Sequence, residues 1–376
     1  MNVVFTCGGT GGHIVPAIAI ANTWKEHYPD SRILFIGGTE KMERELIPKA
    51  GYELISLETH GIRRGKSPAA MWHNVKTVVS TLKAVAACKK IFREVKPQVI
   101  VGTGGYASFP ALLAGSRMGI PTCVHESNAV PGMTTRMAAK WVDRVLVCFT
   151  DSAKYYPDPK KVSVVGMPVR REFIYTDKAQ ARSILGLDHR PVVVSTFGSQ
   201  GAEAMNQMIA ELFRLEKLAG YPFQHIHGVG SFGWRWMPQL VKAKGVDLEK
   251  ETSISMKEYI YDMPTVMTAA DIVISRAGAS SCNEIAACGK PCILIPSPNV
   301  TDNHQEKNAR ALENKGGAIV MLEKDSSAQA VMDCITGLLK DKPGYESMVK
   351  ALHGISIPDS AEQVCKIMRE LTKGNK

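Results

Sequence analysis

The fold of this chain follows from one short stretch, Cys7-Gly8-Gly9-Thr10-Gly11-Gly12-His13. It comes directly after an apolar run that is typical of a strand and directly before a helical pattern, at residues 2–6 and 16–27. Glycine permits positive φ and close approach of the backbone to a ligand. A helix N-terminus offers free N–H groups that suit a phosphate or an oxyanion. A tight turn without a ligand is the alternative, but four glycines within five residues argue against it.

Short apolar runs alternate with helical patterns on both sides of this stretch. The runs are rich in Val, Ile and Leu without polar alternation, as expected of parallel strands buried on both faces. The expected strands of the first half are 2–6, 32–36, 52–57, 98–102, 121–125 and 144–148, and the expected helices are 16–27, 42–50, 69–94 and 109–118. The series predicts a doubly wound parallel sheet.

A second series of the same kind begins near Pro191. Its expected strands are 191–196, 224–228, 271–275, 291–295 and 318–321, and its expected helices are 203–218, 279–288 and 305–315. The fold class is therefore α/β, with two Rossmann-like domains over residues 1–165 and 166–357 and an interdomain cleft. We expect the last helix, within 358–373, to pack back on the first domain.

Two further glycine loops follow expected strands directly. Gly102-Thr103-Gly104-Gly105-Tyr106 lies in the first half, and Phe197-Gly198-Ser199-Gln200-Gly201-Ala202 opens a helix in the second. Ligands of open parallel sheets bind beyond the carboxyl ends of the strands. Three such loops indicate a protein built around phosphates.

Three other known motifs, two glycine-rich nucleotide-binding loops and a zinc site, fit the sequence less well. A dinucleotide loop needs an acid at the end of the second strand, where Gly37-Gly38 stand and Glu40 comes late. The Walker-like run Gly61–Ser67 is one residue short. His125-Glu126 is not the start of HExxH, because residue 129 is Ala. An NAD-dependent oxidoreductase remains the alternative from a different class, and a non-catalytic nucleotide-sugar binder is a third.

Polar side chains gather after other strands. His125-Glu126-Ser127-Asn128 ends one strand, and Asp302–Asn308 opens a helix whose amides suit sugar hydroxyls. Ser275–Glu284 leads from a strand into a helix start with N–H groups free for a phosphate, and Glu284 lies one turn further on. A carboxylate there suits the two hydroxyls of a ribose, whereas a solvated helix-face Glu is the alternative.

Composition favours an anionic partner. The 376 residues carry a formal net charge of +10, which suits phosphate-bearing substrates, an anionic membrane or nucleic acid. A solvated basic surface explains the charge equally well. Nine cysteines without a CxxC pair favour a reduced compartment. No apolar run approaches the ~20 residues of a spanning helix, so we expect any membrane contact to be peripheral.

The motif series GGTGGH, GTGGY, HESN, GMPVR, FGSQGA, SRAGASSCNEIAACGKP and DNHQEKNA resembles a known family. It is similar to the bacterial N-acetylglucosaminyltransferases that add GlcNAc from UDP-GlcNAc to lipid I, making the lipid II precursor of peptidoglycan. The resemblance covers nearly the whole chain and implies a GT-B fold. Another GT-B enzyme with a different lipid or small-molecule acceptor is the nearest alternative.

The resemblance also implies roles for single residues. The backbone of Ile260 would read the uracil, Glu284 would bind the ribose, and Gln305 and Asn128 the GlcNAc hydroxyls. The implied UDP-GlcNAc site comprises Thr10, Gly11, Gly12, Asn128, Arg170, Ser199, Ile260, Ala279, Ser280, Ser281, Cys282, Asn283, Glu284 and Gln305. On the acceptor side stand Gly104, Gly105 and Tyr106. One departure is His304, where some members carry a second Gln.

The implied reaction is an inverting transfer in which the 4-hydroxyl of MurNAc attacks the anomeric carbon. His13 and Glu126 are the candidate bases, and His13 is favoured because imidazole titrates near neutrality. Helix N-termini and Arg170 would stabilise the leaving diphosphate. No Asp-x-Asp motif occurs, so we expect neither a metal nor a cofactor.

The implied location is the cytoplasmic face of the cell membrane, as a peripheral protein. Apolar residues at helical spacing and nearby basic residues suggest an anionic-membrane surface near Trp72 and Trp141, with an ordinary core-facing helix as the alternative. The apolar residues are Met71, Trp72, Val75, Val78, Val79, Leu82 and Val85, and the basic ones are Arg63, Arg64, Lys66, Lys76, Lys83, Arg136, Lys140 and Arg144. Roles in cell shape and cell division and other cell-wall synthesis proteins as partners are expected, but no nucleic acid.

Overall fold

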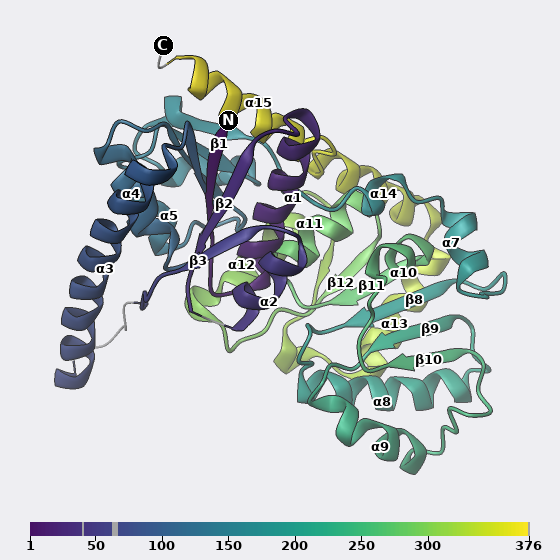
Figure 1. Cartoon of the computed structure of the whole chain (residues 1–376). Helices are drawn as coiled ribbons and strands as arrows, with labels where there is room; N and C mark the ends of the chain where they lie inside the picture. Colours follow the sequence, from purple (N-terminus) through teal and green to yellow (C-terminus); the bar gives the residue numbers. More distant parts are fainter. Residues whose placement is uncertain (40, 62–66, 375–376) are drawn as a thin grey trace. The chain divides into compact units, whose positions relative to one another are not determined.

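The computed structural model describes residues 1–39, 41–61 and 67–374. The chain divides into two compact units, and Figure 1 labels most of their helices and strands. Unit 1 comprises Met1–Val169 and Asp359–Lys376, and unit 2 comprises Arg170–Pro358. None of the helices in the described ranges is long and apolar enough to cross a membrane.

Unit 1 is built on a parallel sheet. In the described part of the chain its strand order is β3-β2-β1-β4-β5-β6-β7. The register places Val3 of β1 opposite Ile33 of β2 and Val99 of β4. The strands are β1 (Asn2–Thr6), β2 (Arg32–Gly37), β3 (Glu53–Ser56), β4 (Val99–Gly102), β5 (Thr122–Glu126), β6 (Arg144–Val147) and β7 (Val162–Val164).

Helices cover both faces of this sheet. On one face, Trp24 of α1 packs in the same buried cluster as Phe5 of β1 and Met368 of α15. On the other, Phe92 of α3 and Leu112 of α4 share a second cluster. The helices of unit 1 are α1 (Gly11–His27), α2 (Lys41–Lys49), α3 (Pro68–Val95), α4 (Ser108–Arg117), α5 (Met133–Ala138) and α15 (Ser360–Lys373), with 3₁₀ turns at Thr150–Tyr155 and Pro159–Lys161.

Unit 2 repeats this architecture around a smaller parallel sheet. Its strand order in the described residues is β10-β9-β8-β11-β12-β13. The strands are β8 (Val192–Thr196), β9 (Gln224–Gly228), β10 (Ile254–Lys257), β11 (Ile272–Ser275), β12 (Cys292–Leu294) and β13 (Ile319–Val320). Its helices are α6 (Glu172–Tyr175), α7 (Lys178–Ile184), α8 (Glu203–Leu218), α9 (Met237–Ala243), α10 (Met263–Ala269), α11 (Ala279–Cys288), α12 (His304–Glu313), α13 (Ala328–Lys340) and α14 (Lys342–Ile355), with 3₁₀ turns at Gly233–Arg235, Thr301–Asn303 and Glu323–Asp325.

The prediction of two doubly wound parallel sheets is confirmed. In each sheet the strand order reverses beside the first strand, between β1 and β4 and between β8 and β11. Such a switch point is where open α/β sheets bind ligands. The glycine loops after β1, β4 and β8 therefore lie at the sheet edge where folds of this kind bind their ligands.

One expected element was misplaced. The first helix begins at Gly11, not at Pro16, so the end of the first glycine loop is already helical. Pro16 has no N–H for the carbonyl oxygen of Gly12. That oxygen instead receives a long hydrogen bond, 3.5 Å, from the Ser127 hydroxyl.

Candidate functional site

The loops after β1 and β4 in unit 1 pack tightly against each other. A Cβ atom on Gly105 would lie 2.1 Å from the carbonyl oxygen of Gly8, and one on Gly104 would lie 2.5 Å from Nδ1 of His13. Both glycines also have positive φ, 108° at Gly104 and 86° at Gly105. Glycine is required at these two positions because any side chain would push the loops apart.

His13 is held by two hydrogen bonds to the loop after β4. Its Nδ1 lies 2.9 Å from the carbonyl oxygen of Thr103, and the Thr103 hydroxyl donates to the carbonyl oxygen of His13 over 2.6 Å. A carbonyl only accepts, so Nδ1 carries the proton and Nε2 carries the lone pair of the neutral ring. This tautomer suits a base that acts through Nε2. Thr103 was not singled out from the sequence.

The expected donor contacts Thr10, Gly11 and Gly12 form the start of α1. Thr10 is the N-cap residue, and its side chain makes no capping hydrogen bond. No acidic residue occupies the first turn. The first N–H groups of a helix have no partner within it, so this N-terminus can bind a negatively charged or hydroxyl-bearing group.

The Glu126 carboxylate accepts hydrogen bonds from residues of its own loop. One carboxylate oxygen accepts hydrogen bonds from the backbone N–H and the side-chain amide of Asn128, both at 3.0 Å. The other oxygen accepts from the backbone N–H of Gly132, also at 3.0 Å. Glu126 is only 2% exposed. These hydrogen bonds let Glu126 hold the loop after β5, which contains Asn128.

The neighbouring His125 is fully buried in unit 1. Its Nε2 donates to the carbonyl oxygen of Gly166 over 2.9 Å. Burial lowers the pKa of His125, against the hydrogen bond to Gly166 and the charge of Glu126, which raise it. By contrast, Tyr106 is exposed, and its ring lies against the backbone of Gly61. Of these two, only Tyr106 is accessible to an acceptor.

In unit 2 the loop after β8 presents Ser199 beside the loop after β9. Gly198 and Gly201 have φ of 92° and 80°. The backbone N–H of Ser231 donates to the carbonyl oxygen of Ser199 over 3.2 Å. A Cβ atom on Gly201 would lie 2.1 Å from the carbonyl oxygen of Val229. The Ser199 side chain is exposed on this closed turn.

The N-terminus of α11 in unit 2 has no side-chain cap. Gly278 is its N-cap and offers no side chain, so the amides of Ala279, Ser280 and Ser281 lack a cap. The Ser280 hydroxyl oxygen is buried and has no hydrogen-bond partner among the described residues. No acidic residue lies in the first turn of α11. Cys282 and Asn283 continue the helix, and Asn283 donates its side-chain amide to the carbonyl oxygen of Ala279.

Glu284 lies further along α11. Burial raises the pKa of the Glu284 carboxyl to about 7, against the nearby charge of Arg170, which lowers it. The guanidinium of Arg170 lies 5.1 Å from the centre of the Phe173 ring. A partly buried carboxyl with a pKa this far from its usual range marks a candidate functional group.

Two other expected donor residues line the same carboxyl edge of the sheet. Ile260 is buried, and a Cβ atom on Gly228 would lie 3.2 Å from its Cδ1 atom. The side-chain oxygen of Gln305 accepts a hydrogen bond from the backbone N–H of Ser297 over 2.9 Å. Its NH₂ group donates to no other residue in the described ranges and can donate to a ligand.

The predicted residues thus form two groups, one in each unit. His13, Thr10, Gly11, Gly12, Gly104, Gly105, Tyr106, Glu126 and Asn128 lie in unit 1, whereas Arg170, Ser199, Ile260, Ala279–Glu284 and Gln305 lie in unit 2. No group of three or more His, Cys, Asp or Glu side chains suited to a metal ion occurs in the described ranges.

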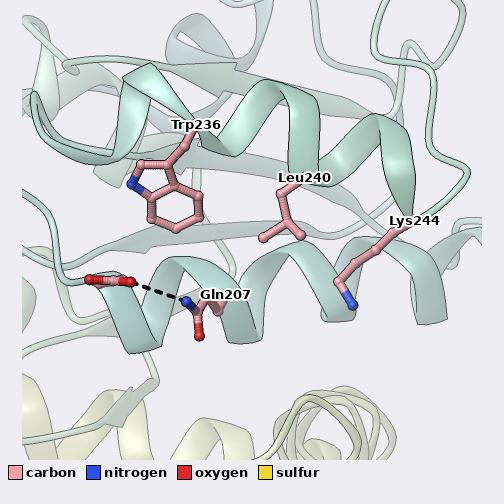
Figure 2. Close-up of a pocket in the computed structure, with 5 residues that line it drawn as sticks. Gln207, Trp236, Leu240 and Lys244 are labelled. Atoms are coloured by element: carbon pink, nitrogen blue, oxygen red, sulfur yellow. Dashed lines mark hydrogen bonds between the residues drawn. The ribbon is translucent and has the colours of Figure 1, made fainter.

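Two grooves are lined by residues outside both groups. One, of about 590 Å³ in unit 2, is lined by Glu203, Gln207, Trp236, Leu240 and Lys244. Figure 2 shows the last four of these side chains. A second, of about 710 Å³, includes Pro121, Asp143 and Arg144 of unit 1, which lie at the amino ends of β5 and β6. Neither groove is lined by a predicted site residue.

The N-terminal half of α3 carries an exposed apolar face. Trp72 is 64% exposed, and Lys76 lies over its ring at 5.7 Å. The other exposed members are Met71, Val75, Val78, Val79 and Leu82. Val85, expected among them, is instead buried in the core. Trp141 is exposed too, with Arg117 over its ring at 5.6 Å. Arg63, Arg64 and Lys66 lie outside the described residues.

Both halves of the chain match domains of one protein family, and full-length relatives share one name. Residues 3–147 match the glycosyltransferase family 28 N-terminal domain, and residues 192–364 match its C-terminal domain. The chain is 39% identical over 374 residues to a protein of Acetivibrio thermocellus, with 99% of each chain covered. It is also 39% identical over 373 residues to one of Caldanaerobacter subterraneus subsp. tengcongensis, covering 99% of this chain and all of the relative. Both are named UDP-N-acetylglucosamine–N-acetylmuramyl-(pentapeptide) pyrophosphoryl-undecaprenol N-acetylglucosamine transferase.

Solved structures share the fold at lower identity. The crystal structure of Acinetobacter baumannii MurG is similar with a TM-score of 0.76 and 22% identity, over 98% of this chain and all of that one. A UDP-GlcNAc 2-epimerase from Neisseria meningitidis, bound to UDP-GlcNAc, gives a TM-score of 0.68 and 16% identity, over 98% of this chain and all of that one. Because proteins of different activity share it, the fold alone does not define the reaction.

Proposed function

The chain belongs to glycosyltransferase family 28, and we propose that it transfers GlcNAc from UDP-GlcNAc to lipid I, the undecaprenyl-pyrophosphoryl MurNAc-pentapeptide. The product is lipid II, the precursor of peptidoglycan. Its fold is of the GT-B type. The observation that carries the proposal in the structure is the uncapped N-terminus of α11, with Glu284 further along the helix and Arg170 close to it.

Unit 2 supplies most of the donor site. A diphosphate would bind the free amides of α11 and the Ser199 hydroxyl, with Arg170 balancing its charge. Glu284 would accept hydrogen bonds from the ribose hydroxyls, and the backbone at Ile260 would read the uracil. Gln305 would donate its NH₂ group to a GlcNAc hydroxyl. Thr10, Gly11, Gly12 and Asn128 of unit 1 are proposed to complete the donor contacts.

Unit 1 supplies the base and the acceptor contacts. His13 is the better candidate base, because Thr103 holds its ring in the tautomer whose Nε2 accepts a proton. Glu126 is the weaker candidate, because its carboxylate braces the loop around Asn128 and Gly132. Tyr106, Gly104 and Gly105 are proposed to line the acceptor side.

The proposed chemistry is a single displacement with inversion. His13 takes the proton from the 4-hydroxyl of MurNAc as its oxygen bonds to the anomeric carbon, and the bond to UDP breaks on the opposite face. Charge develops on the leaving diphosphate, where the α11 amides and Arg170 stabilise it. We propose that neither a metal nor a cofactor takes part.

The exposed face of α3 is proposed to bind an anionic membrane surface from the cytoplasmic side, because lipid I is anchored in a membrane. Apolar side chains would enter the headgroup region, while basic residues contribute roughly 1 kcal/mol each near an anionic leaflet. Lys76 and Lys83 on α3 and Arg136, Lys140 and Arg144 near Trp141 supply charge of this kind. Roles in cell shape and division, alongside other cell-wall synthesis proteins, follow from the product.

A transfer assay tests this function. Labelled GlcNAc from UDP-GlcNAc is offered with a short-chain lipid I analogue, and UDP-GalNAc, UDP-glucose and NADH turnover serve as controls. We expect transfer that is selective for UDP-GlcNAc and is abolished by Glu284→Ala. If UDP-GlcNAc bound without transfer, the acceptor assignment would be wrong, and NADH turnover would overturn the reading of the glycine loops.

A further inference from the structure

A buried carboxylate occupies the first glycine loop. Glu43, in the first turn of α2, is 0% exposed, and its Oε1 accepts a hydrogen bond from the backbone N–H of Gly9 over 2.7 Å. Its Oε2 is buried and has no hydrogen-bond partner among the described residues. A carboxyl placed so deeply with so few partners is costly to bury, which points to a specific role.

Two glycines make room for this side chain. A Cβ atom on Gly8 would lie 2.9 Å from Oε1 of Glu43, and one on Gly37 would lie 3.4 Å from its Cγ. Gly8 follows β1, and Gly37 ends β2. The glycines at the ends of these neighbouring strands therefore serve the approach of Glu43 as well as any approach of a ligand.

The contact divides the loop into two parts. The N–H of Gly9 is used inside the protein, and a phosphate brought to it would meet the carboxylate of Glu43. The start of α1, only two residues further on, has no capping side chain and no acidic residue in its first turn. The backbone N–H groups of Thr10, Gly11 and Gly12 are therefore the ones that we assign to the substrate, and not that of Gly9.

The hydrogen bond between Glu43 and Gly9 is linked to His13 by backbone segments that pack against one another. Glu43 holds Gly9, and the carbonyl oxygen of the adjacent Gly8 packs directly against Gly105. Gly104, the neighbour of Gly105, packs directly against the His13 ring. Movement of the Gly8–Gly9 turn would loosen the packing that fixes this ring.

We propose that Glu43 is a positioning residue, which holds the loop after β1 so that His13 and the start of α1 keep their working geometry. The proposal rests on the proposed transfer reaction for its kinetic consequence. Its structural consequence, a single tautomer of His13, does not depend on that reaction.

The test compares Glu43→Ala, Glu43→Gln and the wild type, with Glu45→Ala as a matched control. Glu45 lies on the same helix but is exposed. Glu43→Gln keeps an oxygen for the N–H of Gly9, whereas Glu43→Ala removes it. The measurements are kcat and KM for transfer to a lipid I analogue, uridine affinity as a report on unit 2, and the ¹⁵N imidazole signals of His13, assigned with His13→Gln.

We expect Glu43→Ala to lower kcat on the order of 10²-fold, as misplaced catalytic groups do. Affinity for uridine, whose proposed contacts Ile260 and Glu284 both lie in unit 2, should stay within about twofold of the wild type. The ¹⁵N imidazole signals of His13 should no longer show a single tautomer with the proton on Nδ1. Glu43→Gln should restore kcat to within about tenfold and restore the single tautomer, because the hydrogen bond survives.

The proposal is overturned if Glu43→Ala keeps both the wild-type kcat and the single His13 tautomer. It is also overturned if Glu45→Ala loses as much kcat, or if the uridine affinity of Glu43→Ala falls in parallel with its kcat, because either result indicates a general loss of folding. A wild-type protein that does not transfer GlcNAc contradicts the proposed function alone, and the His13 signals then still decide the role of Glu43.

Discussion

Thr103 and His13 are joined by two hydrogen bonds, one in each direction. The Thr103 hydroxyl donates to the carbonyl oxygen of His13 over 2.6 Å, and the His13 ring donates from Nδ1 to the carbonyl oxygen of Thr103 over 2.9 Å. The pair ties the start of α1 to the end of β4. It sets both the position and the tautomer of the ring that we propose as the base.

Removal of this base is expected to reduce the chemical step and spare the donor site. His13→Gln should lower kcat by about 10²–10⁴-fold, the usual contribution of general base catalysis. Thr103→Val, which loses only the hydroxyl, should lower kcat less. Rates of transfer and UDP affinity, measured on the same preparations, check this. A His13→Gln enzyme with wild-type kcat would move the role of base to another residue.

The elevated pKa of Glu284, about 7, predicts a pH dependence of nucleotide binding. Ribose hydroxyls donate to the ionised carboxylate, so UDP affinity should rise as pH increases from 6 to 8. The gain attributable to Glu284 is up to about tenfold, because the ionised fraction rises from about a tenth to about nine tenths. Glu284→Gln should lose this part of the dependence in calorimetric titrations. Equal pH dependence in both proteins would contradict the ribose assignment.

The same pKa predicts an effect on unfolding. The folded-state pKa lies above the ordinary carboxyl value of 4.5, so the folded protein binds this proton more tightly than the unfolded chain. The resulting stabilisation is complete below the unfolded pKa and is lost as pH rises through about 7. Without ligand, the Tm of the wild type should therefore fall relative to Glu284→Gln between pH 5 and 8. A difference in Tm that does not change with pH would show that Glu284 is not buried enough to titrate high.

Trp72 and Val79 on the exposed face of α3 provide the test of membrane binding. Trp72→Ser with Val79→Ser should weaken binding to anionic vesicles at least tenfold, because roughly 25 cal/mol is lost per Å² of apolar surface no longer buried. UDP-GlcNAc affinity should stay unchanged. Leu218→Ser is a matched control, since Leu218 is 72% exposed but lies on α8 of unit 2. Unchanged partition of the double variant in vesicle sedimentation would refute this surface.

A chain of buried side chains in unit 2 predicts a stability effect. The Ser195 hydroxyl lies 2.7 Å from Nε2 of His225 and 2.7 Å from Nδ1 of His227, and Nδ1 of His225 lies 2.7 Å from Glu216. Burial lowers the pKa of His227 to about 3 and raises that of Glu216. Ser195→Ala should lower the free energy of unfolding by about 1–3 kcal/mol, because two buried ring nitrogens lose a partner.

Urea unfolding measures this effect. Ser183→Ala, on the exposed side of α7, serves as the control and should stay within about 0.5 kcal/mol of the wild type. A Ser195→Ala protein as stable as this control would show that the buried chain contributes nothing net.

Local signals in the sequence were enough for much of the fold. The bounds of α8 and α11 were predicted to the residue, and α11 is framed by glycines at both ends, with Gly289 in the left-handed region at φ 59°. By contrast, β7 and β10 were missed. Both are short strands at sheet edges, where polar residues such as Ser163 and Ser255 interrupt the apolar run.

The site was predictable where a motif follows a strand, and not where the contact is distant in sequence. The glycine loops and Glu284 stand out locally. Glu43 reaches Gly9 across 34 positions, and Thr103 reaches His13 across 90. Nor could the sequence show that the Glu126 carboxylate accepts hydrogen bonds within its own loop, because those bonds depend on the backbone conformation of residues 126–132.

The product formed from UDP-GlcNAc and a lipid I analogue, identified by NMR, decides whether the enzyme transfers GlcNAc with inversion. We expect a GlcNAc residue in β linkage to the 4-hydroxyl of MurNAc, with UDP released in equal amount. An α linkage would contradict inversion. UDP-GlcNAc that is only hydrolysed, or epimerised at C2 as in the epimerases that share this fold, would contradict the transfer itself.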